Sequence, residues 1–281
     1  MAALTAEQFK AIDDAFKVAA RQVVGKGRKL YPATYDVGIK DAVTYYTMTE
    51  VSAAKLEFKW PTPGTSFDIT NLAPTTKPIP TLHKEFDIDY IKAEASRTTQ
   101  TPLDTQVVAS ATYRVGQLED DLLFQGYSAN GTNYDINGLY RDAGQNYSTS
   151  ADFGTATNVV AAVDGAVALM MAQNWEPPYH MALNPTQFTQ LGTVFSSTGI
   201  PAMDWVKKCG FISDTVMATP DLTDGTGLMV EAGPGWGDIV VSLPLKHIEW
   251  TDEMGGIHGY VLERILPRHW DTNAICQLSA I

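Results

Sequence analysis

The feature that most constrains the fold is a long amphipathic stretch between residues 101 and 126. It opens with Thr101-Pro102, and proline suits the first turn of a helix because the N–H it lacks would find no partner there. Gly126 can end the helix, since glycine readily adopts the backbone of a helix C-terminus. At about 3.6 residues per turn, a spacing of three and four keeps one face apolar over about five turns, so we predict a buried helix over 102–125. The residues with this spacing are Val108, Ala111, Val115, Leu118 and Leu122.

Three acidic residues, Glu119, Asp120 and Asp121, follow one another inside this predicted helix. Successive helical residues point about 100° apart, so the three carboxylates cannot converge on one ion or substrate. We therefore expect them to form a rim that faces solvent or another subunit. We also expect that one of the three acids pairs with an arginine or lysine of a neighbouring subunit.

The residues before the long helix predict a second helix and a projecting β-hairpin. Thr5 can cap a helix that ends near Gly25. Residues 40–60 are rich in threonine, tyrosine and valine, and apolar and polar residues alternate again over 82–94 after a proline-rich excursion. Two such runs predict a hairpin over 43–92. The apolar stripe of the N-terminal helix consists of Phe9, Ile12, Phe16, Ala20 and Val23.

The residues after Gly126 complete the prediction of an α+β fold. Apolar periodicity predicts helices over 155–173 and 185–196, with a buried strand at 179–183 between them. From residue 211 onward, short apolar strands alternate with turns of glycine, proline and aspartate. This order suggests a sheet that collects its strands from distant segments.

Composition narrows the classes of function. The net charge is −12 over 281 residues, so no basic face is expected to neutralise phosphates, although an acidic chain can still enclose nucleic acid. Cys209 and Cys276 match no metal or redox spacing and are expected to be core residues of a reducing compartment. No secretory signal or membrane-spanning run is visible. We expect the chain to be cytosolic or to be assembled in a cytosol.

The local motifs do not predict catalysis. Residues 126–130 depart from a nucleophile elbow because they follow a helix, and Pro234 removes an amide that a phosphate loop would use. Ala232 stands where a calcium loop needs a bidentate glutamate. We predict no catalytic residue, metal or cofactor and no enzyme, with an unrecognised hydrolase as a remote alternative. The five histidines show no ligand spacing: His83, His180, His247, His258 and His269.

The order of these segments resembles the Hong Kong 97 (HK97) type shell proteins, which comprise the major capsid proteins of tailed double-stranded DNA viruses and the encapsulins. The run from "YDVGIKDAVTYYTMTEV" through "KPIPTLHKEFDIDYIKAE" to "QLEDDLLFQG" is similar to the family's extended loop and long spine helix. "DINGLY", "MALNPTQFTQL" and "YVLERILPRHWDTNAICQLSAI" resemble later family segments. The resemblance implies an HK97-like fold and self-assembly into an icosahedral shell of pentamers, with or without hexamers.

The resemblance also implies a division of the chain into five parts. These are an N-terminal helix and arm (1–42), the extended hairpin loop (43–92), a peripheral domain with the spine helix (93–198), a mostly axial domain (199–255), and C-terminal strands that return to the peripheral domain (256–281).

Two branches of this family remain open. The start "MAALTAEQ" matches encapsulins poorly, and the hairpin region is more similar to phage proteins, so we favour the major capsid protein of a tailed virus. Its partners would be copies of itself, DNA enclosed without sequence-specific binding, and scaffolding, portal or decoration proteins. The alternative is an encapsulin, a cytoplasmic nanocompartment shell around a cargo enzyme.

Each branch makes some residues candidates for contact. For assembly we predict subunit contacts through Tyr45, Phe58, Trp60, Phe67 and Phe86, and through the acids Glu119, Asp120 and Asp121. For the cargo alternative, Phe9, Ile12 and Phe16 would line a groove that takes a cargo peptide.

Overall fold

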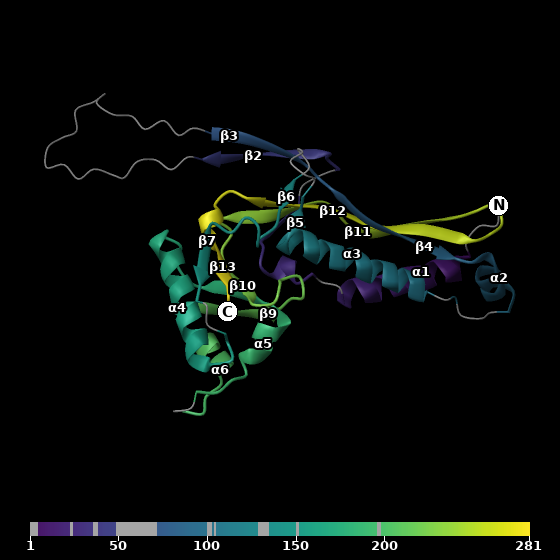
Figure 1. The fold of residues 1–281 in the computed structure, drawn as a ribbon. Helices are drawn as coiled ribbons and strands as arrows, with labels where there is room; N and C mark the ends of the chain where they lie inside the picture. The colour runs from purple at the N-terminus through teal and green to yellow at the C-terminus, as the bar shows by residue number, and fades with distance from the viewer. Residues whose placement is uncertain are drawn as a thin grey trace, which may run out of the picture.

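The computed structural model describes residues 5–22, 25–35, 39–48, 72–99, 103, 105–128, 135–149, 152–195 and 198–281. It is an α+β fold in which a long sheet with two helices alongside extends from a body of shorter strands and helices (Figure 1). The buried apolar residues form two clusters, one under each part.

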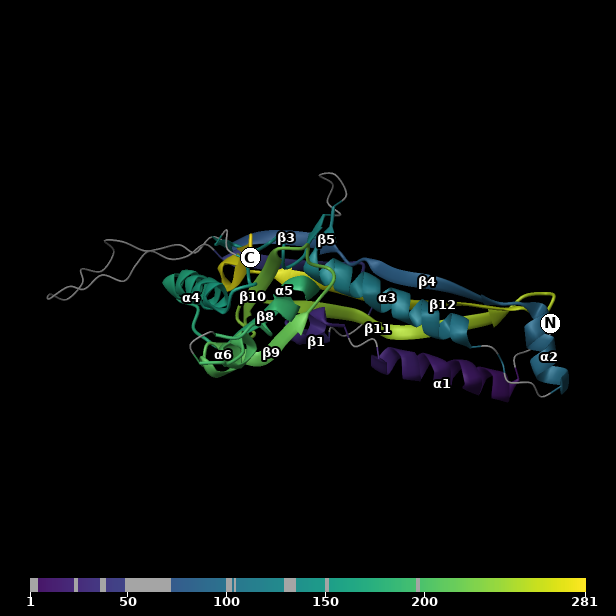
Figure 2. The same ribbon diagram turned by 60° about the horizontal axis from the view of Figure 1, so that its bottom comes forward.

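The long sheet has the strand order β1-β11-β12-β4. Its members are β1 (Ala33–Tyr35), β4 (Thr81–Ile88), β11 (Gly237–Thr251) and β12 (Ile257–His269). Buried and half-buried residues alternate along most of β12, as expected for a strand covered mainly on one face. Two helices, α1 (Ala6–Gln22) and α3 (Gln106–Phe124), run beside these strands (Figure 2). This half contains most of the first cluster of buried residues.

The long helix predicted over 102–125 is confirmed as α3. Gly126 follows it with φ +77°, and a Cβ there would lie 2.2 Å from the carbonyl oxygen of Ile136, so only glycine fits this turn. Leu118 was predicted on the buried face but is 47% exposed. The buried stripe passes instead through Glu119, because a helix of about 3.6 residues per turn drifts away from a strict spacing of three and four.

The second sheet has the order β7-β13-β10-β8-β9. Its strands are β7 (Gln145–Ser148), β8 (Tyr179–Leu183), β9 (Ile212–Ala218), β10 (Thr226–Glu231) and β13 (Ile275–Ser279). Helices α4 (Ala156–Ala172), α5 (Pro185–Gln190) and α6 (Ala202–Lys208) lie beside it (Figure 1). The predictions of α4 and β8 are confirmed, whereas α5 is shorter than predicted and α6 was missed.

Strand β10 separates the two clusters. Leu228 and Val230 belong to the first cluster and Met229 to the second. Successive side chains of a strand point to opposite faces, so each face of β10 is buried in a different core. The predicted unit 93–198 therefore contains α3 from one cluster and α4 from the other, and the predicted domain boundaries remain a prediction.

The predicted hairpin is present with different strands. β2 (Ala42–Met48) pairs antiparallel with β3 (Leu72–Pro78), which lies in the segment predicted as a proline-rich excursion. A two-stranded ribbon tolerates the prolines of β3 because one edge of each strand is unpaired. Figure 1 shows this hairpin beside the body.

The second predicted hairpin strand, over 82–94, is wrong in two ways. Its first half is β4, which pairs with β12 in the long sheet. Its second half is helix α2 (Tyr90–Thr99). The smaller elements are η1 (Gly27–Lys29), β5 (Gly126–Tyr127), β6 (Ile136–Asn137) and η2 (Thr272–Ala274).

Candidate functional site

A buried ionic cluster joins three distant parts of the chain. Arg28 of η1 donates hydrogen bonds through Nε to Glu119 of α3 and through Nη2 to Glu263 of β12. Glu119 is 3% exposed and Glu263 is fully buried. One guanidinium thus faces two carboxylates in the interior, where an unpaired charge would cost several kcal/mol.

This arrangement changes the protonation of Glu119. Burial and the neighbouring Glu263 raise the pKa of Glu119 and Arg28 opposes both, so that the pKa comes to about 7. The pKa of Glu263 is also raised, again chiefly by burial. The pair therefore holds a proton more readily than two exposed glutamates would.

The prediction that the acids form a rim facing solvent or another subunit is wrong for Glu119. Its partner is an arginine of the same chain, because position 119 lies on the buried stripe of α3. Asp120 is half-buried and accepts a hydrogen bond from the backbone N–H of Gly27 at 2.9 Å. Asp121 alone is exposed and remains a candidate for a contact between subunits.

Tyr31, His269 and Asp142 form a relay that resembles a nucleophile, a base and an acid. The Tyr31 hydroxyl lies 2.6 Å from Nε2 of His269, and Nδ1 of His269 lies 2.7 Å from Oδ2 of Asp142. Tyr31 is buried, and burial raises its pKa well above the ordinary value. The Tyr31 hydroxyl therefore stays protonated. Its contact with His269 holds the N-terminal segment on β12.

The aromatic residues predicted as subunit contacts separate into three groups. Tyr45 lies half-buried on β2, and its neighbour Tyr46 is 57% exposed, so the hairpin offers aromatic surface. Phe86 is buried in the first cluster and cannot reach another subunit, because its position in β4 faces the core. Phe58, Trp60 and Phe67 lie outside the described residues.

The predicted groove of the N-terminal helix is not formed by the predicted residues. Ile12 and Phe16 are buried, and Phe16 packs on the ring of His247 with centroids 4.7 Å apart. Phe9 remains half exposed. A hollow of about 430 Å³ lies instead on another face of α1, between α1 and the first turn of α3. It is lined by Ala11, Asp14, Ala15, Val18, Ala19, Thr105, Gln106 and Ala109.

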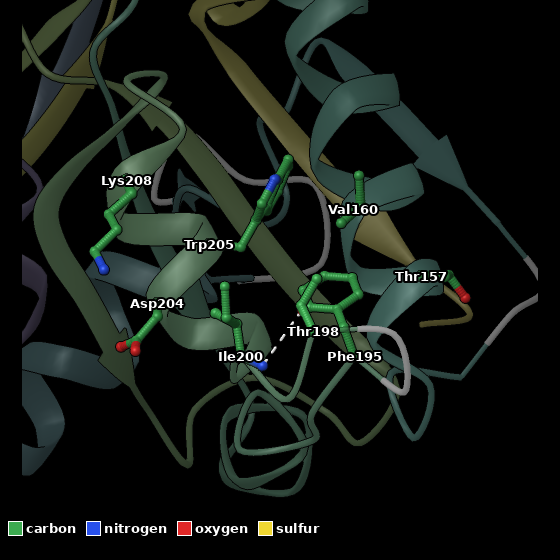
Figure 3. A pocket seen from close by; sticks show the side chains of 8 residues that line it. All are labelled: Thr157, Val160, Phe195, Thr198, Ile200, Asp204, Trp205 and Lys208. Carbon is green, nitrogen blue, oxygen red and sulfur yellow. Dashed lines mark hydrogen bonds between the residues drawn. The ribbon is translucent and has the colours of Figure 1, made fainter.

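A second hollow of about 500 Å³ lies beside α4 and α6 (Figure 3). Val160 of α4, Trp205 of α6 and the loop residues Phe195 and Ile200 give it apolar walls. Figure 3 shows these four side chains around one space, with Asp204 and Lys208 to one side. The hollow adds apolar surface to the second half of the molecule.

The described ranges contain no group of three or more metal-ligating side chains. Across the same part of the chain, no helix combines the length and hydropathy that crossing a membrane requires.

Solved structures similar to this chain include a virus-like particle and a phage capsid. The virus-like particle from Pyrococcus furiosus matches with a TM-score of 0.71 at 17% identity, covering 97% of this chain and all (100%) of that chain. The capsid of Myoviridae phage XM1 matches with a TM-score of 0.70 at 12% identity, covering 90% of each. The fold is therefore the HK97-like capsid fold. This confirms the predicted fold class.

A family model described as an encapsulating protein for peroxidase, Linocin_M18, matches residues 1–253, so the chain belongs to this family. The type 1 encapsulin shell protein EncA of Myxococcus xanthus (strain DK1622) is 27% identical over 202 residues, 72% of this chain and 68% of the relative. The diheme-cytochrome-encapsulin shell fusion protein of Kuenenia stuttgartiensis is 27% identical over 127 residues, 45% of this chain and 34% of the relative. The chain is a shell-forming protein of the capsid and encapsulin type, and the shells of this type are homo-oligomeric.

Proposed function

We propose that the chain is the shell subunit of an encapsulin, which assembles into a closed cytoplasmic compartment around a cargo enzyme. The observation that carries this proposal is the family match over residues 1–253. It favours the encapsulin alternative over the tailed-virus capsid protein that the sequence analysis preferred. The similarity to a phage capsid at 12% identity concerns the fold, which both branches share.

Assembly would use the surfaces that a single chain leaves uncovered. The hairpin β2–β3 exposes Tyr46, helix α2 exposes Ile91, and the turn between β11 and β12 exposes Met254. Buried apolar area contributes about 25 cal/mol per Å², so contacts of modest size become strong when every subunit repeats them. Tyr45 and Asp121 remain candidates for such contacts.

The cargo would bind in the hollow between α1 and α3. Five of its eight lining residues are alanine or valine, and Val18 is largely exposed, so the hollow offers apolar surface to a short peptide. The description of the family model points to a peroxidase as the class of cargo. Packaged DNA and portal proteins, which belong to the viral alternative, have no support from these residues.

Electron microscopy of the purified chain tests assembly. Closed particles of uniform diameter are expected, and a chain that stays monomeric at micromolar concentration would contradict the proposal. Mass spectrometry of proteins retained inside the particles then separates the two branches. An enclosed enzyme supports the encapsulin, whereas long DNA protected from nuclease would favour the viral capsid protein.

A further inference from the structure

The outer end of the long sheet carries a hollow that the proposed function does not use. The register of β4, β12 and β11 places Asp87, His258 and Trp250 side by side across the sheet. The next row on the same face, two residues along each strand, contains Glu85, Tyr260 and Ile248. Carboxylates of β4 thus stand beside aromatic rings of β12 and β11.

The ring of Trp250 lies in contact with the rings of Tyr260 and His258. The centroids of Trp250 and Tyr260 lie 5.0 Å apart at 39°, and those of Trp250 and His258 lie 6.2 Å apart at 28°. They border a hollow of about 290 Å³ that Glu85 and Asp87 also line. Trp250 is 43% exposed although it is among the largest apolar side chains, so the chain itself leaves this hollow uncovered.

Two carboxylates hold His258 in place. Its Nδ1 lies 3.0 Å from Oδ1 of Asp87, and its Nε2 lies 3.0 Å from Oδ2 of Asp252. The hydrogen bond from His258 lowers the pKa of Asp252, which keeps that carboxylate charged. Both ring nitrogens are occupied, so His258 contributes its ring face to the hollow and not a free nitrogen.

Glu85 has a different role. Its side chain is exposed, and within the described part of the chain no hydrogen bond or ion pair engages it. Aromatic faces carry negative potential and attract a cation placed over them, most strongly for tryptophan. A carboxylate without a partner beside Trp250 and Tyr260 therefore completes a site for a positive group.

We propose that this hollow, formed by Glu85, Asp87, Trp250, His258 and Tyr260, receives a lysine or arginine side chain from a second copy of this chain. A volume of about 290 Å³ is at the lower limit for small-molecule pockets and suits the end of one side chain. The ring faces of Trp250 and Tyr260 and the carboxylate of Glu85 match a positive charge. The inference rests on the proposed function, because only a shell brings a second copy against this surface. The contact would be head-to-tail, so every subunit would give one cation and receive one.

The test compares particles of three variants with the wild type. Glu85→Gln removes the charge of the hollow, and Trp250→Leu removes the ring but keeps an apolar side chain. Glu253→Gln is the matched control, because Glu253 is exposed in the turn between β11 and β12 and does not line the hollow. Light scattering measures the subunit concentration at which half of the chains are in particles.

We expect Glu85→Gln and Trp250→Leu each to raise this concentration about three- to tenfold. This fold-change corresponds to the free energy with which a cation over an exposed aromatic ring stabilises a contact. Circular dichroism checks that each variant is folded, and Glu253→Gln is expected to match the wild type. If all three variants assemble like the wild type, or if choline reaches the hollow and changes tryptophan fluorescence in intact wild-type particles, this inference is wrong while the shell function stands. A wild-type chain that forms no particles overturns both.

Discussion

Arg28, in the segment after the N-terminal helix, is bonded to Glu119 in the long helix, although 91 residues separate them in the sequence. The same guanidinium bonds Glu263, which is 235 residues away. One side chain therefore ties the N-terminal segment to both layers of the larger half of the molecule. A Cβ at Gly25 would lie 3.0 Å from Oδ1 of Asp120, and one at Gly27 would lie 2.6 Å from Cδ1 of Leu123, so the backbone of this segment lies directly against α3.

Replacing Arg28 by methionine should destabilise the chain by about 3–5 kcal/mol, because two buried carboxylates lose their only cationic partner among the described residues. Thermal unfolding followed by circular dichroism measures the loss. Lys29→Met is the matched control, since Lys29 is exposed and adjacent. Equal stability of the two variants would contradict the structural role of Arg28.

The raised pKa of Glu119 predicts a dependence of stability on pH. The folded-state pKa, about 7, lies above the ordinary value of 4.5, so the contribution is fully present below pH 4.5 and is lost as the pH rises through 7. We expect the melting temperature to fall between pH 5 and about 8, and Glu119→Gln to flatten that slope. Glu7→Gln removes an exposed carboxylate and should leave the slope as it is. An unchanged slope in Glu119→Gln would assign the pH dependence to other groups.

Gly27→Ala should weaken the docking of the N-terminal segment. A Cβ at position 27 would lie 2.6 Å from Cδ1 and 2.8 Å from Cβ of Leu123, which is buried and has little room to move. Overpacking of this kind costs about 1–3 kcal/mol. Gly235→Ala is the control, since the nearest atoms there lie at an ordinary 3.4 Å. Chemical denaturation compares the two, and a tolerated Gly27→Ala would mean that the segment can shift.

The cargo site is tested by Val18→Asp. A carboxylate placed in the hollow between α1 and α3 would have to be desolvated when an apolar peptide binds, so cargo is expected to be lost from otherwise normal particles. Val18→Leu keeps the surface apolar and should retain cargo. The ratio of cargo to shell protein on a denaturing gel is the measurement. Full loading of the Val18→Asp particles would place the cargo site elsewhere.

Local sequence patterns were sufficient for the elements whose signal is local. The C-terminal end of α3, the ends of α4 and both ends of β8 follow from apolar periodicity and terminating residues, whereas α3 begins at Gln106 and not at the predicted residue 102. Helix α2 was missed because the alternation through residues 86–91 predicts a strand. Asp89 was the available signal, since its side chain accepts a hydrogen bond from the backbone N–H of Ile91 at 2.9 Å and its carbonyl accepts one from Ala93.

Long-range contacts were beyond the reach of these patterns. Nothing near Glu119 indicates that Arg28 and Glu263 will surround it, so a buried acid was predicted to be exposed. The sequence analysis paired the segment that begins with β4 with the hairpin strand before it, whereas β4 pairs with β12. This pairing joins residues that are distant in the sequence, such as Phe86 and Gly259, and no local spacing encodes it. The sequence patterns could not separate virus from encapsulin for a related reason, because the two branches share this architecture and the short N-terminal segment carries little information.

The placement of the last strands has a consequence for when the subunit can be used. β12 lies between β11 and β4, and β13 lies between β7 and β10, so each sheet has an inner strand drawn from residues 257–279. A ribosome adds those residues after residues 5–256. While translation continues, both sheets lack an inner strand, so β4 and β7 have no partner in these sheets and β10 and β11 each keep one unpaired edge. A nascent chain therefore cannot offer a finished surface to its neighbours, and recruitment into a lattice must wait until synthesis has passed residue 279.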